Sequence, residues 1–149
     1  MNKTRDILLD QIYNLSPQNF DQICMGVYQY QIKYNPLYSK FVQLLGKEHS
    51  VSKPEEIPFL PISLFKNHQI QSDNWKEEAI FRSSGTTSSS NSQHWIRSLD
   101  WYNRISEKTF EKFYGPVSDY AILALLPSYL ERNDSSLVYM IHHFIQKSN

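Results

Sequence analysis

Apolar residues recur at three- and four-residue spacing through the first third of the chain, which predicts a helical region over residues 1–46. Ser16 is a suitable N-cap and Pro17 a suitable first helical residue, so we expect the second helix to begin there. The Asn-Pro pair at 35–36 interrupts the pattern, and Gly46 is expected to end a third helix. The apolar positions of these helices are Ile7, Leu8, Ile12, Phe20, Ile23, Cys24, Val27, Tyr30, Tyr34, Leu37, Phe41, Leu44 and Leu45.

Residues 47–78 form a different kind of segment, rich in proline and polar residues. Pro54, Pro58 and Pro61 exclude a regular helix, because proline lacks the N–H donor and its ring clashes with the preceding turn. The apolar stretch 57–61 is expected to lie extended on the protein. We therefore interpret 47–78 as a connecting segment.

Two short segments with β character, 79–82 and 93–98, follow the connecting segment. Only the hydroxyl-rich run 83–92 separates them. The pattern predicts an antiparallel hairpin whose connection is this run.

The last third of the chain combines helical patterns with one continuous apolar run. Asp100 can cap a helix that ends at the Gly-Pro pair 115–116, and Asp134 or Ser135 can cap a final helix. Residues 120–126 are uniformly apolar, which predicts a strand buried on both faces. A buried strand followed by a helix is half of a parallel βαβ unit, so we expect the start of a parallel sheet flanked by helices.

Length and composition favour one folded domain over 1–149. Hydrophobic residues make up 40% of the chain and aromatic residues 14%, which is typical of a globular protein. The expected fold class is α/β, with a helical part at 1–46, the connecting segment at 47–78 and the α/β part at 79–149.

Charge and cysteine usage exclude several classes of function. Lys and Arg number 15, Asp and Glu number 15, and the formal net charge is zero, so we expect no nucleic-acid partner. The single cysteine, Cys24, excludes an intrachain disulfide, and no histidine pattern predicts a metal site. We expect no signal peptide and no membrane span, and hence a cytoplasmic protein.

The run 83–92 is the strongest candidate for chemistry. It combines serine and threonine hydroxyls with Gly85, whose missing Cβ allows a charged ligand to approach the backbone closely. Successive N–H groups in a turn can hold a phosphate, but the same composition is also typical of an ordinary flexible loop. Lys66 and Arg97 could each approach a phosphate or simply be solvated surface charges.

Three stretches in series carry a resemblance to a known family: 57–66, 81–87, and 124–132 with 135–140. The second contains Ser83-Ser84-Gly85-Thr86-Thr87, which resembles the phosphate-binding signature of adenylate-forming enzymes. Together the three stretches resemble the LuxE-type acyl-protein synthetases of that superfamily. The resemblance implies a partial N-terminal domain of the adenylate-forming (ANL) type.

The resemblance also implies the chemistry. By this resemblance, the carboxylate of a fatty acid attacks the α-phosphate of ATP, which gives an acyl-adenylate and releases pyrophosphate. The acyl group then passes to a protein thiol, and AMP leaves. ATP and Mg²⁺ are the implied cofactors, and a protein that accepts or donates the acyl group is the implied partner. The implied phosphate ligands are Ser83, Ser84, Gly85, Thr86, Thr87 and Ser88.

The chain departs from the family pattern in two respects. Ser88 stands where a glycine is usual, and no lysine follows it before Gln93. The later family elements have no match, so the resemblance implies the N-terminal portion of a longer enzyme and assigns no catalytic residue. The alternatives are a non-catalytic nucleotide-binding module and a structural or interaction fragment that self-associates.

Overall fold

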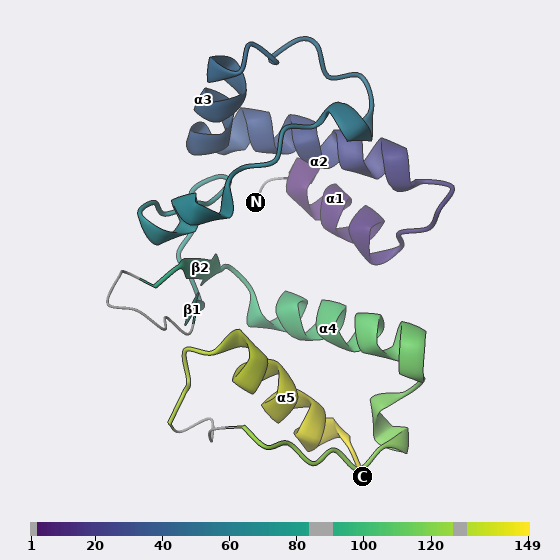
Figure 1. Ribbon diagram of the computed structural model, residues 1–149. Helices are drawn as coiled ribbons and strands as arrows, with labels where there is room; N and C mark the ends of the chain where they lie inside the picture. The colour runs from purple at the N-terminus through teal and green to yellow at the C-terminus, as the bar shows by residue number, and fades with distance from the viewer. Residues whose placement is uncertain (1–2, 84–90, 127–130) are drawn as a thin grey trace. The chain divides into compact units, whose positions relative to one another are not determined.

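The computed structural model describes residues 3–83, 91–126 and 131–149, and the chain divides into two compact units (Figure 1). Unit 1 comprises Met1–Leu64 with Ile70–Asn74, and unit 2 comprises Phe65–Gln69 with Trp75–Asn149. Helices predominate, and the described residues include one two-stranded antiparallel sheet. The prediction of a mixed helix-and-strand protein is confirmed at this level.

Unit 1 begins with two helices, α1 (Lys3–Tyr13) and α2 (Phe20–Tyr34). The predicted start of the second helix at Ser16 and Pro17 is wrong, because Asn19 occupies the N-cap position. Asn19 folds back instead: its Oδ1 accepts from the Ser16 N–H at 2.7 Å, and its Nδ2 donates to the Asn14 carbonyl at 3.2 Å. These bonds stabilise a turn where the first helical turn was expected.

The predicted helix break at 35–36 is confirmed, and Asn35 explains it. Asn35 is buried between α2 and α3 (Pro36–Leu44). Its backbone N–H donates to Gln31 O at 2.9 Å and so completes α2, while its Oδ1 accepts from the Tyr38 N–H at 3.1 Å and so caps α3. One residue therefore ends one helix with its backbone and begins the next with its side chain.

The core of unit 1 joins these helices to the proline-rich segment, which includes the short 3-10 helix η1 (Pro54–Glu56). Tyr28, Tyr38 and Val42 are buried, with Val42 at 0% exposure, and the two tyrosine rings meet edge to face at 6.2 Å. The Tyr38 hydroxyl donates to Pro58 O at 2.8 Å, so the extended stretch is fastened to the core. Burial raises the pKa of Tyr38 to about 12, with a smaller contribution from Tyr28.

Unit 2 contains the predicted hairpin. Strands β1 (Ala79–Arg82) and β2 (Gln93–Ile96) pair antiparallel, with Ala79 opposite Ile96 and Arg82 opposite Gln93. The second strand ends two residues earlier than expected. A further short 3-10 helix, η2 (Ile62–Lys66), spans the sequence boundary at which unit 2 begins.

Helix α4 (Leu99–Tyr114) follows the hairpin. Its N-cap is Ser98, whose Oγ accepts from the Trp101 N–H at 3.2 Å, so the prediction of Asp100 as the cap is wrong. Asp100 lies in the first turn instead. The predicted end is confirmed: Gly115 adopts φ +83°, a conformation that glycine tolerates and other residues rarely adopt.

The last elements are the 3-10 helix η3 (Val117–Asp119) and helix α5 (Ser136–Lys147). Ser135 is the N-cap of α5, which confirms one of the two predicted cap residues. The strand predicted at 120–126 is wrong for this structure. These residues belong to no sheet, and Leu123 and Leu125 are 97% and 105% exposed. Among the described residues no third strand is present to pair with this run, which explains why its sequence pattern does not produce a strand.

Over the ranges 3–83, 91–126 and 131–149, no helix combines the length and the hydrophobicity needed to cross a membrane.

Candidate functional site

Ser83 is the first residue of the hydroxyl-rich loop, and it lies at the closed base of the hairpin. Its backbone N–H donates to Ser92 O at 3.1 Å, and its Oγ accepts from the Ser92 N–H at 3.0 Å. The Ser83 hydroxyl keeps its own proton as a donor, because it serves here as an acceptor. Ser83 is also exposed, so a ligand can reach this hydroxyl.

The other five residues of the predicted site lie outside the described residues. They are Ser84, Gly85, Thr86, Thr87 and Ser88. The structure therefore places the first residue of the predicted site and the strands that lead into and out of it. The assignment of the remaining five stays a prediction.

Arg82 anchors the strand that leads into the loop. Its backbone N–H donates to Asp134 O at 2.8 Å, and its Nη1 lies 3.8 Å from Asp134 Oδ2. Arg132 Nε lies 3.4 Å from Asp134 Oδ1, so two guanidinium groups share this carboxylate. Each guanidinium has five N–H donors, and the single carboxylate of Asp134 cannot accept from all the donors of both Arg82 and Arg132. Donors suited to a phosphate therefore remain beside the base of the loop.

Sequence reasoning did not identify the cluster of Arg82, Arg132 and Asp134. The sequence pattern indicates Asp134 only as a possible helix cap. The two arginines lie far apart in the sequence, and no local pattern relates them. Their meeting depends on the packing of β1 against the turn before α5.

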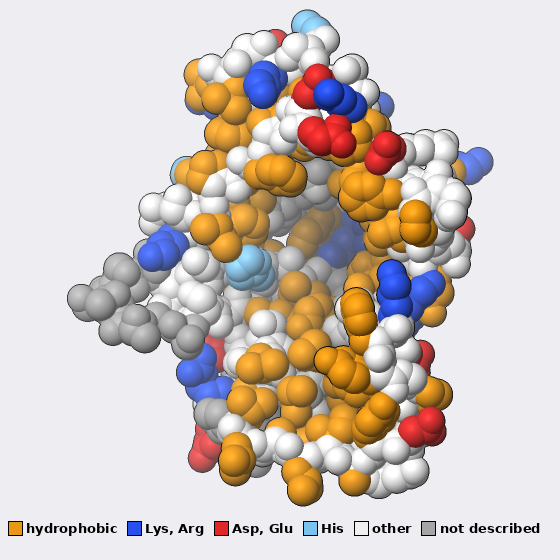
Figure 2. Space-filling model, turned by 45° about the vertical axis from the view of Figure 1, so that its right-hand side comes forward, with side chains coloured by type: hydrophobic (Ala, Val, Ile, Leu, Met, Phe, Trp, Pro, Cys, Tyr) orange, Lys and Arg blue, Asp and Glu red, His pale blue; other side chains and the backbone are white. Residues whose placement is uncertain are grey.

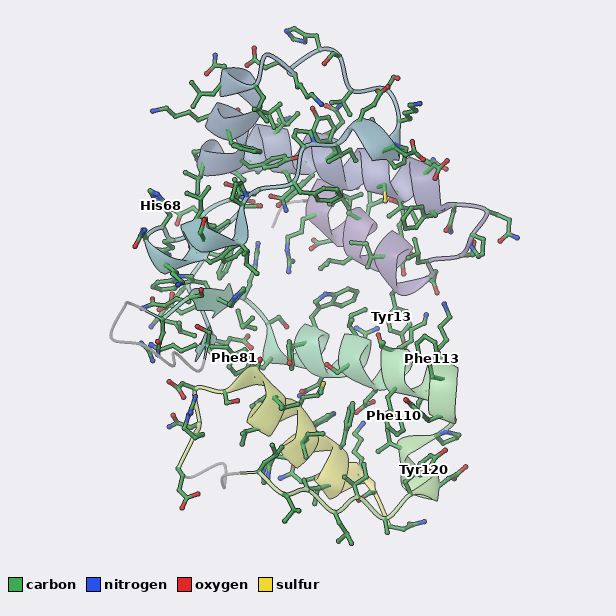
Figure 3. The ribbon with its side chains drawn as sticks, viewed as in Figure 1. Tyr13, His68, Phe81, Phe110, Phe113 and Tyr120 are labelled. Carbon is green, nitrogen blue, oxygen red and sulfur yellow. The ribbon has the colours of Figure 1, made fainter. Side chains whose placement is uncertain are left out.

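An aromatic cluster beneath β1 holds the hairpin to the helices of unit 2. Phe81 is 3% exposed, and its ring centroid lies 5.4 Å from that of Tyr102 and 5.5 Å from that of Tyr139. Tyr102 comes from α4 and Tyr139 from α5, and their own rings lie 5.8 Å apart. Phe81 is labelled in Figure 3 at the junction of strand and helices. One residue of β1 thus joins the base of the loop to both helices.

The two basic residues that the sequence offered as phosphate ligands have different surroundings. Lys66 is exposed and follows Phe65, whose ring stacks on His94 of β2 at 4.7 Å. The loop connects Arg82, the last residue of β1, to Gln93, the first residue of β2. Arg97 follows Ile96, which pairs with Ala79 at the opposite end of the hairpin. At about 3.3 Å per strand residue, Arg97 begins about 13 Å from Gln93. Its position does not suit a ligand of the loop.

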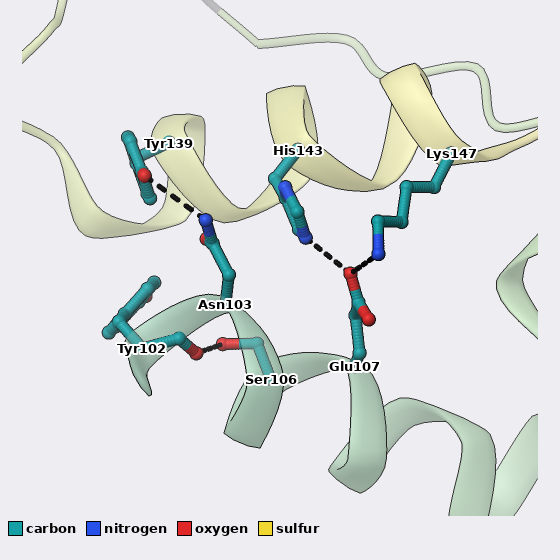
Figure 4. Close-up of polar contacts among 7 residues, drawn as sticks. All are labelled: Tyr102, Asn103, Ser106, Glu107, Tyr139, His143 and Lys147. Atoms are coloured by element: carbon teal, nitrogen blue, oxygen red, sulfur yellow. Dashed lines mark hydrogen bonds and ion pairs between the residues drawn. The ribbon is translucent and has the colours of Figure 1, made fainter. Parts of the chain in front are cut away.

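A second polar cluster ties α4 to α5 (Figure 4). Glu107 Oε1 accepts from Lys147 Nζ at 2.7 Å and is paired with His143 Nε2. Partial burial of Glu107 opposes its ionisation, but the hydrogen bonds and charges of Lys147 and His143 outweigh it and lower the pKa of this carboxyl. Glu107 is therefore a carboxylate at neutral pH, held as a structural ion pair.

The neighbouring histidine, His142, turns elsewhere on α5 and contacts Gln146 at 3.0 Å. Adjacent histidines on a helix point in different directions, as expected from helical geometry. In the described ranges, no group of three His, Cys, Asp or Glu side chains is arranged to hold a metal ion.

Comparison with known proteins gives no match: no family model fits the chain, and neither curated proteins nor solved structures show a significant similarity.

Proposed function

We propose that this chain provides the triphosphate-binding loop for ATP-dependent activation of a carboxylic acid. The acid, of the fatty-acid class in the resembling family, would become an acyl-adenylate, and its acyl group would pass to a protein thiol. The observation that supports this proposal is the hairpin of β1 and β2, which presents the hydroxyl-rich run as a connection closed by the Ser83–Ser92 hydrogen bonds.

The proposed site consists of Ser83, Ser84, Gly85, Thr86, Thr87 and Ser88. Backbone N–H groups and hydroxyls would donate to the β- and γ-phosphate oxygens, and Mg²⁺ would neutralise part of their charge as pyrophosphate departs. The guanidinium groups of Arg82 and Arg132 would add positive charge at the entrance to the loop.

The proposal extends to the architecture that the resemblance implies, a helix-flanked parallel sheet of the adenylate-forming type. It assigns the chain to the LuxE-like acyl-protein synthetases, with an acyl-accepting or acyl-donating protein as partner. No general base is proposed, because an ionised carboxylate is already the nucleophile.

The test is a calorimetric titration of the protein with Mg²⁺ and ATP, repeated for Gly85→Val and for Ser118→Ala. We expect wild type and Ser118→Ala to bind ATP equally, because Ser118 is an exposed residue of η3. Gly85→Val is expected to lose binding without loss of helix content, because the new branched side chain would occupy the space of the phosphates. Equal ATP affinity in wild type and Gly85→Val would refute the site.

Isotope exchange between pyrophosphate and ATP separates the enzyme from a binding module. Exchange that depends on an added carboxylic acid supports adenylation. ATP binding without exchange supports the nucleotide-binding alternative for this chain.

A further inference from the structure

The turn before α5 lies against β1 beside the base of the hydroxyl-rich loop, and backbone hydrogen bonds hold it there. The Arg82 N–H donates to Asp134 O at 2.8 Å. The Ser135 N–H donates to Arg132 O at 3.2 Å, which closes the turn itself. Both bonds use main-chain atoms only. The position of the turn against β1 therefore does not depend on the side chain of Asp134.

The side-chain contacts of the same cluster are loose. Arg82 Nη1 lies 3.8 Å from Asp134 Oδ2, and Arg132 Nε lies 3.4 Å from Asp134 Oδ1. Both distances exceed the roughly 2.7–2.9 Å of a strong charge-assisted hydrogen bond. The side chains of Arg82, Arg132 and Asp134 are 43%, 40% and 30% exposed, and ion pairs open to solvent contribute little stability. Another anion can therefore displace the Asp134 carboxylate from the arginines at small cost.

A phosphate group suits these donors better than the carboxylate does. A guanidinium binds phosphate through two parallel N–H···O bonds, and a tetrahedral phosphate offers oxygens on several sides, so one phosphate can accept from both arginines. Arg82 and Arg132 carry two positive charges, but Asp134 and its exposed neighbour Glu131 carry two negative charges. On the face that Figure 2 shows, the described Lys and Arg side chains are scattered and do not gather into one basic patch. A phosphate therefore gains the arginine donors by displacing Asp134 and not through a surplus of positive charge.

We propose that Arg82 and Arg132 form a binding site for a phosphate group, which takes over the donors that the Asp134 carboxylate holds. The turn stays on β1 through its backbone bond while the Asp134 side chain rotates away. Asp134 is thus an internal competitor that limits the affinity of the site for anions. The assignment of this phosphate to the terminal phosphates of ATP, or to the pyrophosphate that leaves, rests on the proposed function. The site itself lies outside the run 84–88.

The test is an NMR titration of the full chain with sodium pyrophosphate at constant ionic strength, followed through the Nε–H signals of Arg82 and Arg132. We expect saturable shifts of both signals in wild type. Asp134→Asn is expected to lower the Kd about fivefold, because it removes a unit charge about 4 Å from the anion in a medium close to water. Arg132→Gln is expected to raise the Kd by at least the same factor. Arg132→Lys keeps the charge but loses the planar fork, so it is expected to weaken binding less than Arg132→Gln does.

Two control variants make the same changes of charge elsewhere in unit 2. Glu111→Gln and Lys112→Gln alter exposed residues in the last turn of α4, about 18–20 Å along the helix from its first residue. Each is expected to change the Kd less than about twofold, because salt screens charges at that distance. Equal effects of Asp134→Asn and Glu111→Gln would overturn the proposal, since only net charge would then matter. Unshifted arginine signals, or a Kd that Asp134→Asn leaves unchanged or raises, would overturn it as well.

The variants also keep this result separate from that of the loop. If Gly85→Val retains full ATP affinity while Asp134→Asn tightens pyrophosphate binding, the proposed function fails and the arginine site stands. Loss of ATP binding in Gly85→Val, with no response to Asp134→Asn, supports the loop and overturns the arginine site. Should Arg132→Gln fail to fold, Asp134→Asn decides, because it keeps the backbone bond to Arg82.

The same titrations with ATP distinguish the two sources of the phosphate. If Asp134→Asn tightens ATP binding as well, the site holds the terminal phosphates of the nucleotide. If it tightens only pyrophosphate binding, the site holds the released product.

Discussion

Phe81 packs the strand that leads into the candidate site against helices α4 and α5, so its truncation is an informative perturbation. The ring is 3% exposed and lies against Tyr102 and Tyr139. Truncation of a buried phenylalanine to alanine costs about 3–5 kcal/mol, through lost burial and the cavity left behind. The Phe81 ring also makes two aromatic contacts at favourable centroid distances, so we expect the cost of Phe81→Ala to lie in the upper half of that interval.

Tryptophan fluorescence in urea is a suitable assay, because Trp75, Trp95 and Trp101 all lie in unit 2. With a denaturant slope of about 2 kcal/mol per M, a loss of about 4 kcal/mol lowers the unfolding midpoint by about 2 M. Phe113→Ala is the matched control, since Phe113 is 73% exposed in the same unit. Its cost is expected to stay within about 0.5 kcal/mol.

The comparison of the two phenylalanine variants can refute the reasoning. If Phe81→Ala destabilises unit 2 no more than Phe113→Ala does, then the aromatic cluster does not hold the hairpin to the helices. The Arg82 and Ser83 positions would then lack the rigid support that we assign to them.

Two further predictions concern helix α4. Glu107→Gln is expected to reduce stability at neutral pH. Folding lowers the pKa of Glu107, so the ionised carboxylate adds to the free energy of unfolding. This contribution is complete above the ordinary pKa of 4.5 and is lost as the pH falls through the folded-state pKa. Urea unfolding at several pH values should therefore show the wild type and Glu107→Gln converging in acid, and a constant difference would contradict the ion-pair assignment. Ser98→Ala is expected to cost about 1 kcal/mol as the loss of an N-cap, and Asp100→Ala only a few tenths, by thermal unfolding. A larger effect of Asp100→Ala would mean that the cap is misassigned.

Local sequence signals predicted the parts of the fold that depend on local chemistry. The hairpin follows from two short β segments and the run between them. The helix boundaries at Asn35 and Gly115 follow from side-chain capping and from the positive φ that glycine tolerates. Where two cap-forming residues lie close together, as with Ser98 and Asp100, the pattern cannot choose, because the choice depends on the backbone angles at each position.

The features that sequence reasoning missed depend on contacts between distant segments. The 120–126 segment has the composition of a buried strand, but a strand forms only where a neighbour supplies hydrogen bonds. Arg82 meets Arg132 through Asp134, and Glu107 meets His143 and Lys147, only because β1, α4 and α5 pack together. Of the candidate site, Ser83 could be both predicted and placed, whereas 84–88 rests on the pattern of residues and the resemblance.

The central claim is that the hydroxyl-rich run binds the phosphates of ATP, and an amide NMR titration with Mg²⁺ and ATP tests it residue by residue. We predict that the largest chemical-shift changes fall on residues 83–88, with smaller changes at Arg82 and Ser92, and that Gly85→Val abolishes them. Saturable changes confined to another part of the chain, with the amides of 83–88 unmoved, would contradict the claim.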